Sequence, residues 1–256
     1  MFSIKFIRLL LILSAFITTK TVSAESVLVA VAANFTKPME EIAAEFTKET
    51  RHQVELSFGA SGKFVAQIEN GAPFQVFLSA DEQKPKKLID SQFAVAGTQF
   101  TYSLGRLVLW SAKPDFIDQQ GKVLSSGNFK HLAIADPKLA PYGEAAMTVL
   151  KKLGLEERIK PLLVLGENIT QTQQFISTGN AELGFIAVSQ VIKDGKISEG
   201  SGWIVPSELY APIRQDAVLL KNGATHPAAL ALLDFLKSAK AQAIIEKYGY
   251  GLAVKP

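Results

Sequence analysis

The hydrophobic positions of this chain follow two alternating patterns. Short runs that are apolar throughout, such as SVLVAVAA at residues 26–33, are typical of strands buried between layers of helices. Between these runs, apolar residues recur at helical spacing, as at Met39, Ile42 and Phe46, which places one apolar stripe against a sheet. The alternation predicts an α/β fold.

The same patterns give the expected boundaries of each element. Strands are expected at residues 26–33, 53–58, 76–79, 107–110, 132–135, 163–165, 183–188 and 216–220. Helices are expected around residues 39–46, 64–68, 146–153 and 170–178, after Asp81, and as one long helix from Thr225 to Tyr248. Breaks near residues 102–106 and 210–214 separate two sets of elements and fit two lobes, although periodicity alone leaves open whether the chain crosses between them twice.

The first 24 residues have the pattern of a secretory signal peptide. Lys5 and Arg8 form a positive start, residues 9–18 are nearly all apolar, and Val22-Ser23-Ala24 supplies the small residues of a cleavage site. The apolar stretch is about ten residues long, whereas a membrane span needs roughly 20. We therefore expect the leader to be cleaved and the mature protein to be extracytoplasmic.

Composition excludes several classes of protein. With 256 residues, of which 48% are hydrophobic and 20% charged, the chain is an ordinary globular protein. The absence of Cys excludes disulfides, thiol catalysis, zinc fingers and lipid attachment through an N-terminal cysteine, so a periplasmic location is expected. Cleavage of the leader removes three of the 27 basic residues and leaves 24 against 24 acidic ones. A neutral mature chain lacks the basic surface that nucleic-acid binding requires.

Searches for catalytic motifs mostly fail. The segment FGASGK at residues 58–63 resembles a nucleophile elbow, but Lys63 stands where that motif needs a second glycine. It also fails as a phosphate-binding loop, because Phe64 follows Lys63 and no glycine stands five residues before Gly62. We expect no catalytic residue from this segment.

The histidines do not predict a metal site. No two of them have metal-ligand spacing, and they are expected to face solvent or to cap helices: His52, His131 and His226. Neither a protein-bound metal nor a cofactor is expected.

Four short loops, each joining a strand to a helix and rich in small residues, are the remaining candidates: residues 32–35, 59–62, 141–143 and 167–170. In open α/β sheets the ligand lies beyond the carboxyl ends of the strands, and each helix start there offers unpaired N–H groups to an anion. For Asn34 and Ser61 the alternative is N-capping, worth about 1 kcal/mol each. For Tyr142 the alternative is packing. The loops indicate an anion site without identifying the anion.

At these loops the sequence resembles the periplasmic molybdate-binding proteins of ABC transporters. The resemblance covers essentially the whole mature chain, and its motifs are specific only in combination. They are AANF (32–35), FGASGKF (58–64), GAP and VFLSAD (71–73 and 76–81), IADP and APYG (134–137 and 140–143), ENITQTQQF (167–175), GNAELGFIA (179–187) and PIRQDAVLL (212–220).

The resemblance implies a fold and a set of partners. The fold is the two-lobed periplasmic binding protein fold of type II, an α/β architecture with two crossovers and the ligand in the cleft between the lobes. Lobe 1 is expected at residues 25–104 and 212–256, and lobe 2 at residues 105–211. The expected partners are molybdate or tungstate and the membrane permease of an ABC transporter, and the protein itself is expected to be a monomer.

The resemblance also implies which residues bind the tetrahedral dianion, which the family holds without a counter-charge. Asn34 and Ser61 of the first lobe are expected to give side-chain and backbone donors. In the second lobe, Tyr142 is expected to give its hydroxyl or N–H, and Ile169 its N–H. Ala33 is a further candidate through its N–H.

Three positions depart from the pattern of relatives. Some relatives have Ser where Asn34 stands, and some have a ligand Tyr where Ala187 stands. We expect Tyr142 to supply the hydroxyl that Ala187 lacks. Gln75 replaces an acid that is common in the family, and the sequence suggests no effect of this change.

Two other functions stay open from the sequence. A binding protein for another tetrahedral oxyanion, such as sulfate or thiosulfate, would keep the fold and change the radius of the site. A secreted hydrolase using Ser61 as nucleophile would need a histidine base within hydrogen-bond reach of it.

Overall fold

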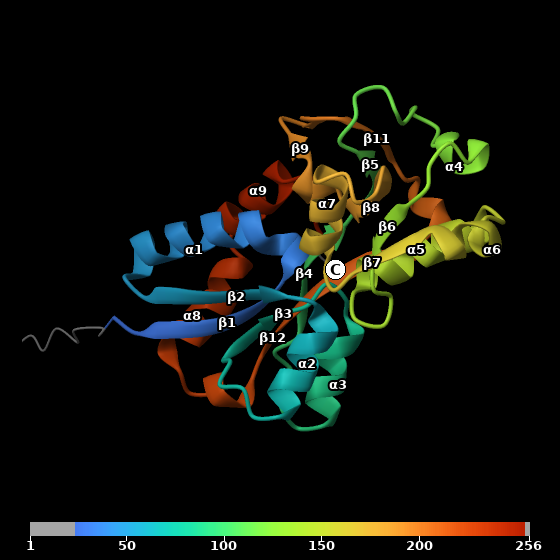
Figure 1. The fold of residues 1–256 in the computed structure, drawn as a ribbon. Coiled ribbons are helices and arrows are strands. Elements are labelled where there is room, and N and C mark those ends of the chain that lie inside the picture. Colours follow the sequence, from blue (N-terminus) through green and yellow to red (C-terminus); the bar gives the residue numbers. More distant parts are fainter. Residues whose placement is uncertain (1–23, 254–256) are drawn as a thin grey trace, which may run out of the picture.

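The computed structural model describes residues 24–253, so all but the last residue of the expected signal peptide, residues 1–24, lies outside the described residues. The described chain forms two five-stranded sheets, each covered by helices, together with one two-stranded hairpin (Figure 1). Within this part of the chain, no helix is both long and apolar enough to span a bilayer.

The first sheet has the strand order β2-β1-β3-β12-β4. β1 pairs in parallel with β2 and β3, whereas β12 runs antiparallel to both β3 and β4. Its strands are β1 (Ser26–Ala32), β2 (Gln53–Gly59), β3 (Val76–Leu78), β4 (Phe100–Gly105) and β12 (Ile213–Leu219).

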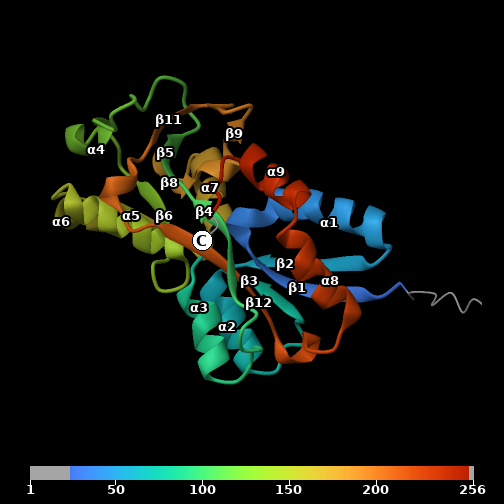
Figure 2. The same cartoon turned by 180° about the vertical axis from the view of Figure 1, so that it is seen from behind.

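Both faces of the first sheet are buried, which explains the uninterrupted apolar run in β1. Successive side chains of a strand point to opposite faces, so Val29 and Val31 pack under one group of helices and Ala30 under another. The first group is α1 (Thr36–Thr50), α8 (Pro227–Leu236) and α9 (Ala239–Lys247), which lie beside one another in Figure 2. The second group is α2 (Ser61–Glu69) and α3 (Gln83–Asp90).

The second sheet has the order β11-β5-β8-β6-β7. β6 runs parallel to both β7 and β8, whereas β5 runs antiparallel to its two neighbours, β11 and β8. Its strands are β5 (Leu107–Ser111), β6 (Leu132–Ala135), β7 (Leu163–Gly166), β8 (Leu183–Ala187) and β11 (Ser201–Ile204). Helices α5 (Pro141–Lys152) and α7 (Ile169–Ser177) pack against β6 and β8. The short elements of this half are α4 (Val123–Ser126), α6 (Glu156–Ile159), β9 (Ile192–Lys193) and β10 (Lys196–Ile197).

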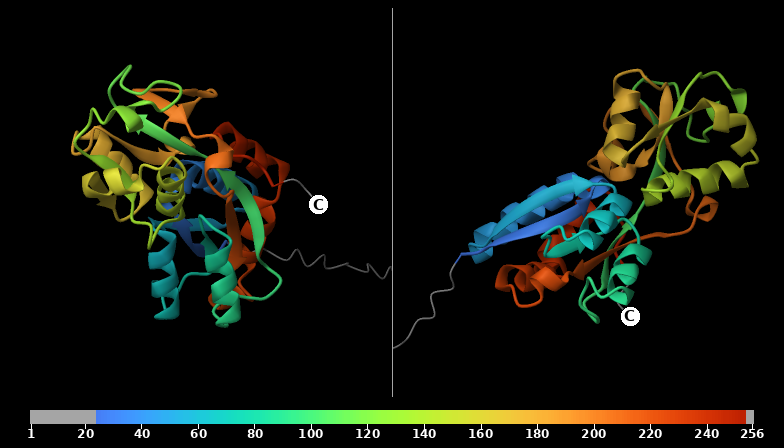
Figure 3. Two further views of the ribbon diagram at one scale, coloured as in Figure 1. Left: turned by 90° about the vertical axis from the view of Figure 1, so that its right-hand side faces the viewer. Right: turned by 60° about the horizontal axis from the view of Figure 1, so that its bottom comes forward.

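The chain passes between the two sheets twice. The first crossing runs from β4 directly into β5, and the second is the segment 205–212 between β11 and β12. The right-hand view of Figure 3 shows these two connections bridging two separate lobes. This is the expected α/β fold with two lobes and two crossovers.

The expected long helix from Thr225 to Tyr248 is wrong. The structure divides it into α8 and α9, because the hydroxyl of Ser238 caps the second helix by accepting a hydrogen bond from the N–H of Ala241 at 3.2 Å. The break turns α9 onto α1, where Lys247 forms an ion pair with Glu41 at 2.9 Å. The buried positions of α8, such as Leu232 and Leu236, and those of α9, such as Ala241 and Ile245, do not lie on one continuous helical stripe.

Other differences arise where local pattern is weak. Residues 102–105 belong to strand β4 rather than to a break, and β9, β10 and β11 were not expected.

The expectation that the histidines face solvent or cap helices is wrong for His52, which is buried and stacks on Phe46. Its Nδ1 accepts a hydrogen bond from the N–H of Glu25 at 3.2 Å, a partner that no local pattern could indicate.

The start of α5 lies so close to the end of β6 that only glycine fits there. A Cβ on Gly143 would lie 2.0 Å from the carbonyl oxygen of Ala135. We expect Gly143→Ala to lower the free energy of unfolding by about 1–3 kcal/mol, because the helix must move off the strand. Thermal denaturation checks this, with the exposed neighbour Glu144→Ala as control; equal melting temperatures for the two variants would contradict it.

Candidate functional site

The four loops singled out in the sequence meet at one small cavity between the lobes. Its unoccupied space, counted together with the open space at its mouth, is about 220 Å³. The loops that follow β1 and β2 approach from one lobe, and the loops that follow β6 and β7 from the other. The lining residues are Ala32, Ala33, Asn34, Gly59, Ala60, Ser61, Ala80, Ala140, Pro141, Tyr142, Asn168 and Ile169.

All five candidate residues therefore line the same cavity, and each occupies the first or second position of a helix. Ala33 and Asn34 begin a 3₁₀ turn that leads into α1. Ser61 and Ile169 are the first residues of α2 and α7, and Tyr142 is the second residue of α5. The N–H groups of a first turn have no acceptor within their own helix. The structure thus places five such N–H groups around the cavity.

The residues before these helices leave the N–H groups uncapped. Ala32, Ala60 and Ala140 occupy the N-cap positions, and none has a side chain that can accept a hydrogen bond. The capping alternative for Asn34 and Ser61 is wrong, because both lie inside the helical turn rather than before it. Other helices, such as α3 and α8, also lack a side-chain cap, but here three uncapped helix starts meet at one cavity, where a ligand can serve as their acceptor.

Helix α7 is capped in a way that spares one donor. The side-chain oxygen of Asn168 accepts from the N–H groups of Thr170 and Gln171, both at 3.0 Å. The N–H of Ile169 is not part of this cap. Of the first turn of α7, the donor that remains for a ligand is thus the one the sequence indicated.

The hydroxyl of Ser61 is oriented as a donor. Its oxygen accepts a hydrogen bond from the N–H of Ala80 at 3.0 Å, and the side chain is buried at the cavity wall. Because one lone pair is engaged by Ala80, the hydroxyl hydrogen is available for a ligand. None of the three histidines, all within the described chain, hydrogen bonds to Ser61, so the geometry of a serine hydrolase is not present.

The cavity is lined by neutral residues only, although charged side chains lie near it. At its edge, Lys63 of α2 forms an ion pair with Glu167 of the opposite lobe at 2.6 Å, with both side chains nearly half exposed. This pair bridges the lobes and lies outside the lining. Any anion in the cavity would meet uncharged donors rather than a cation.

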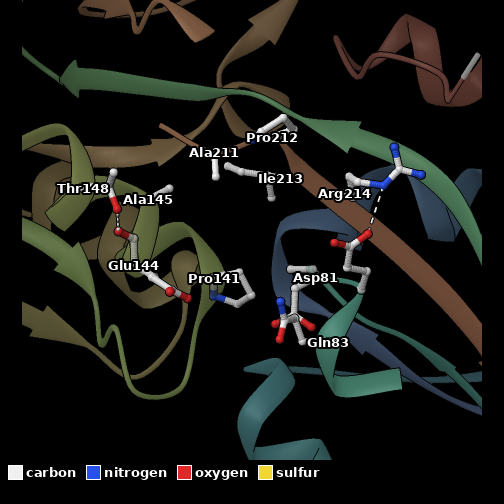
Figure 4. A pocket seen from close by; sticks show the side chains of 12 residues that line it. Asp81, Gln83, Pro141, Glu144, Ala145, Thr148, Ala211, Pro212, Ile213 and Arg214 are labelled. Atoms are coloured by element: carbon white, nitrogen blue, oxygen red, sulfur yellow. Dashed lines mark hydrogen bonds and ion pairs between the residues drawn. The ribbon is translucent and has the colours of Figure 1, made fainter. Parts of the chain in front are cut away.

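A second, larger pocket shares Ala80 and Pro141 with the cavity in its lining. Figure 4 shows the side chains that line it. Its unoccupied space is about 640 Å³, and its charged lining comprises Asp81, Glu82, Glu144 and Arg214. Arg214 is paired with Glu82 at 3.0 Å and Asp81 with Lys84, and the lining itself holds three carboxylates against one cation. This pocket therefore disfavours a dianion, in contrast to the neutral cavity beside it.

Behind the cavity, Tyr142 takes part in contacts that sequence reasoning missed. Its hydroxyl oxygen accepts from Nε2 of Gln215 at 3.0 Å, and Gln215 in turn contacts Asn34 and Tyr102. Burial raises the pKa of the Tyr142 hydroxyl well above its usual range, so this group stays neutral. The segment PIRQDAVLL contains Gln215, but its type and spacing gave no sign of this role.

The two lobes are in contact across the cleft. The N–H of Gly62 donates to the carbonyl of Leu139 at 2.9 Å, and the hydroxyl of Ser189 donates to the carbonyl of Asn34 at 3.0 Å. Ala33 and Ala80 of the first lobe also join the apolar core of the second. The structure is that of a closed cleft.

Two of the three positions that depart from relatives, Gln75 and Ala187, have structural roles within their own lobes. The side-chain oxygen of Gln75 accepts a hydrogen bond from the N–H of Leu28 at 2.8 Å, so Gln75 supports strand β1. Ala187 is buried at the end of β8, and its N–H donates to the side chain of Gln190 at 3.0 Å.

Comparisons with known proteins agree with this geometry. Residues 27–251 match the family model of the bacterial extracellular solute-binding proteins. The chain is 58% identical to the molybdate-binding protein ModA of Azotobacter vinelandii, over 96% of this chain and 97% of that one. It is 56% identical to the protein of the same name from Rhodobacter capsulatus, over 89% of each chain.

A solved structure, the periplasmic molybdate-binding protein of Azotobacter vinelandii, superimposes with a TM-score of 0.86. The match covers 89% of this chain and all of that one, at 43% identity. The chain therefore belongs to the bacterial extracellular solute-binding protein family, and within it to the group of the molybdate-binding proteins.

Proposed function

We propose that this protein captures molybdate, and tungstate as well, in the periplasm and delivers it to the permease of an ABC transporter. The observation that carries the proposal is the neutral cavity at which helix starts of both lobes meet, and where the first-turn N–H groups of the five candidate residues have no side-chain cap. The relatives, which share more than half of their residues with this chain, are named as molybdate-binding proteins. The role needs binding and release and no catalytic step.

The number of donors matches the demand of a buried dianion. Burying an uncompensated ion costs many kcal/mol, so protein donors must replace the lost water. The candidates are the N–H groups of the five lining residues and the hydroxyl of Ser61. Hydrogen bonds to a charged group contribute about 1.5–3 kcal/mol each, which is enough to offset desolvation and leave tight binding.

Size supplies the selectivity among fully deprotonated oxyanions. The donors are fixed by four backbone segments, so the distances between them are set by the packing of helices on sheets. Sulfate is smaller than molybdate and would lie too far from some donors. Tungstate is nearly the same size as molybdate and would be accepted.

Binding of the anion between the two lobes changes the conformation that the protein presents to the permease. We propose that residues 25–104 with 212–256 and residues 105–211 move as two lobes about the crossovers. An anion that contacts both lobes favours the closed form, because only there does it make all of its contacts. The proposed carrier is a monomer released into the periplasm after cleavage of the leader.

Calorimetric titration of the mature protein tests the proposed ligand. Molybdate and tungstate are expected to bind with micromolar or tighter affinity, and sulfate and phosphate at least 100-fold more weakly. The thermal shift measured with each anion is the control. Tight binding of sulfate or thiosulfate with no response to molybdate would replace the proposal by the alternative oxyanion function.

Ser61 tests the geometry of the site. Ser61→Ala removes one hydroxyl donor, so the affinity for molybdate is expected to fall by about 1–3 kcal/mol, or roughly 5- to 150-fold. The matched control is Ser177→Ala on the exposed face of α7, whose hydroxyl donates only to the carbonyl of Gln173. Equal dissociation constants for the two variants, measured by calorimetry, would exclude Ser61 from the site.

Gly62 tests closure of the cleft. A Cβ there would lie 3.0 Å from the carbonyl oxygen of Leu139 in the opposite lobe. Gly62→Ala is expected to weaken molybdate binding by about 1–3 kcal/mol, because the lobes can no longer approach fully. The ligand-free protein should melt at the same or a higher temperature, since alanine favours the helix. An unchanged affinity would show that closure does not need this approach.

A further inference from the structure

A buried group of six polar side chains lies behind the cavity and joins the two lobes. We call it the back network, and its role as argued here rests on the proposed binding of an oxyanion. Its members are Asn34, Tyr102, Tyr142, Ser189, Gln215 and Tyr250, all of them buried. Three neutral phenols are included, because burial raises the pKa of each of them.

Gln215 is the centre of the back network and is completely buried. Its Oε1 accepts from Nδ2 of Asn34 at 2.8 Å and from the hydroxyl of Tyr102 at 3.0 Å. Its Nε2 donates to the hydroxyl oxygen of Tyr142 at 3.0 Å. One side chain thus connects a candidate ligand residue of the first lobe with one of the second.

The Asn34 amide is turned the wrong way for an anion. Both hydrogens of its Nδ2 are engaged, one by Gln215 and the other by the hydroxyl of Tyr250 at 2.9 Å. Its Oδ1 has no hydrogen-bond partner in the described part of the chain, and Asn34 lines the cavity. An oxygen facing the cavity repels an anion, whereas the amide nitrogen would donate to it.

The back network can reverse its hydrogen bonds without displacing its side chains. A 180° rotation of a terminal amide exchanges its oxygen and nitrogen, and the two ends have nearly the same shape. Once the Asn34 amide turns, its Oδ1 occupies the position that Nδ2 held, 2.8 Å from Oε1 of Gln215. Two oxygens at that distance repel, so Gln215 must turn as well and donate to Asn34 through Nε2. Neither amide can turn alone.

The remaining members complete the reversed network. The hydroxyl of Tyr142 then donates to Oε1 of Gln215 instead of accepting from Nε2. Tyr102 accepts from Gln215 and donates to the carbonyl of Ser79 at 3.1 Å. The hydroxyl of Tyr250 turns from the carbonyl of Asn34 to donate to Oδ1 of Asn34, and that carbonyl keeps the hydroxyl of Ser189 as its donor at 3.0 Å. Every group within this set retains a partner.

We propose that Gln215 is a positioning residue whose amide turns together with that of Asn34 when the oxyanion binds. Asn34 then donates to the anion, and the reversal reaches Tyr142 in the other lobe. The contact of the first lobe with the ligand is thereby coupled to the hydrogen bonding of the second. Gly105 leaves room for this, since a Cβ there would lie 2.6 Å from Nε2 of Gln215.

Nuclear magnetic resonance of the wild-type protein, free and saturated with molybdate, tests the turn directly. Nuclear Overhauser contacts from the Gln215 side-chain amide protons to the Tyr102 ring, which lies in the same lobe, are expected in the loaded protein and not in the free one, where Nε2 points away from Tyr102. Gln215→Leu identifies the signal by its loss. Contacts to the same ring in both states would overturn the proposal.

Affinity provides a second test with two variants. A carboxylate only accepts hydrogen bonds, so Gln215→Glu holds the Asn34 nitrogen away from the anion and adds a negative charge. We expect at least 100-fold weaker molybdate binding at pH 8. Gln215→Leu frees Asn34 to turn alone and should cost less than tenfold. Both variants are checked for folding by thermal denaturation.

The outcomes separate this inference from the proposed function. Equal losses in the two folded variants would reduce Gln215 to a structural role and overturn the proposal, as would affinities within threefold of the wild type for Gln215→Glu. If the wild-type protein does not bind molybdate, the proposed function fails instead. The same resonance experiment is then run with the oxyanion that raises the melting temperature.

Discussion

The structure depends on the hydrogen-bond deficit at the starts of its helices. Every α-helix leaves its first N–H groups without an internal acceptor, and proteins commonly satisfy them with Ser, Thr, Asp or Asn at the N-cap. Here Ala32, Ala60 and Ala140 stand at that position around the cavity. By contrast, Ser238 caps α9, far from the cleft, with its hydroxyl. Side-chain caps are also missing from α1, α3 and α8, so what marks this cavity is that several uncapped helix starts meet there.

The sheets bring these helix starts together. In a parallel arrangement the carboxyl ends of strands lie at one edge, so the helices that follow β1 and β2 begin side by side, as do those that follow β6 and β7. The two crossovers set these edges opposite each other across the cleft. The topology thus fixes where the anion site lies, and the side chains determine how closely the backbone donors can approach the anion. Small residues at the loops allow the backbone to approach the ligand.

The sequence predicted most of this arrangement, for identifiable reasons. The buried strands and the strand-to-helix loops follow from apolar periodicity and small residues, which are local signals. The resemblance to the family selected five residues of these loops, and all five line the cavity. The break at Ser238 and the strands of residues 192–204 depend on tertiary packing and were missed. The back network was also missed, because its bonds join residues up to 216 positions apart. No local pattern reports such a contact.

Neutral donors have a physical advantage over a cation in this cleft. A lysine or arginine in the cavity would lose side-chain entropy on binding and would be left buried and unpaired when the anion departs. Backbone N–H groups are already ordered by their helices and are solvated again when the lobes open. The nearby charges support this division, since Lys63 pairs with Glu167 outside the lining and Arg214 with Glu82 in the adjacent pocket. The cations are thus held away from the cavity, and the lobes can release a dianion without separating a buried ion pair.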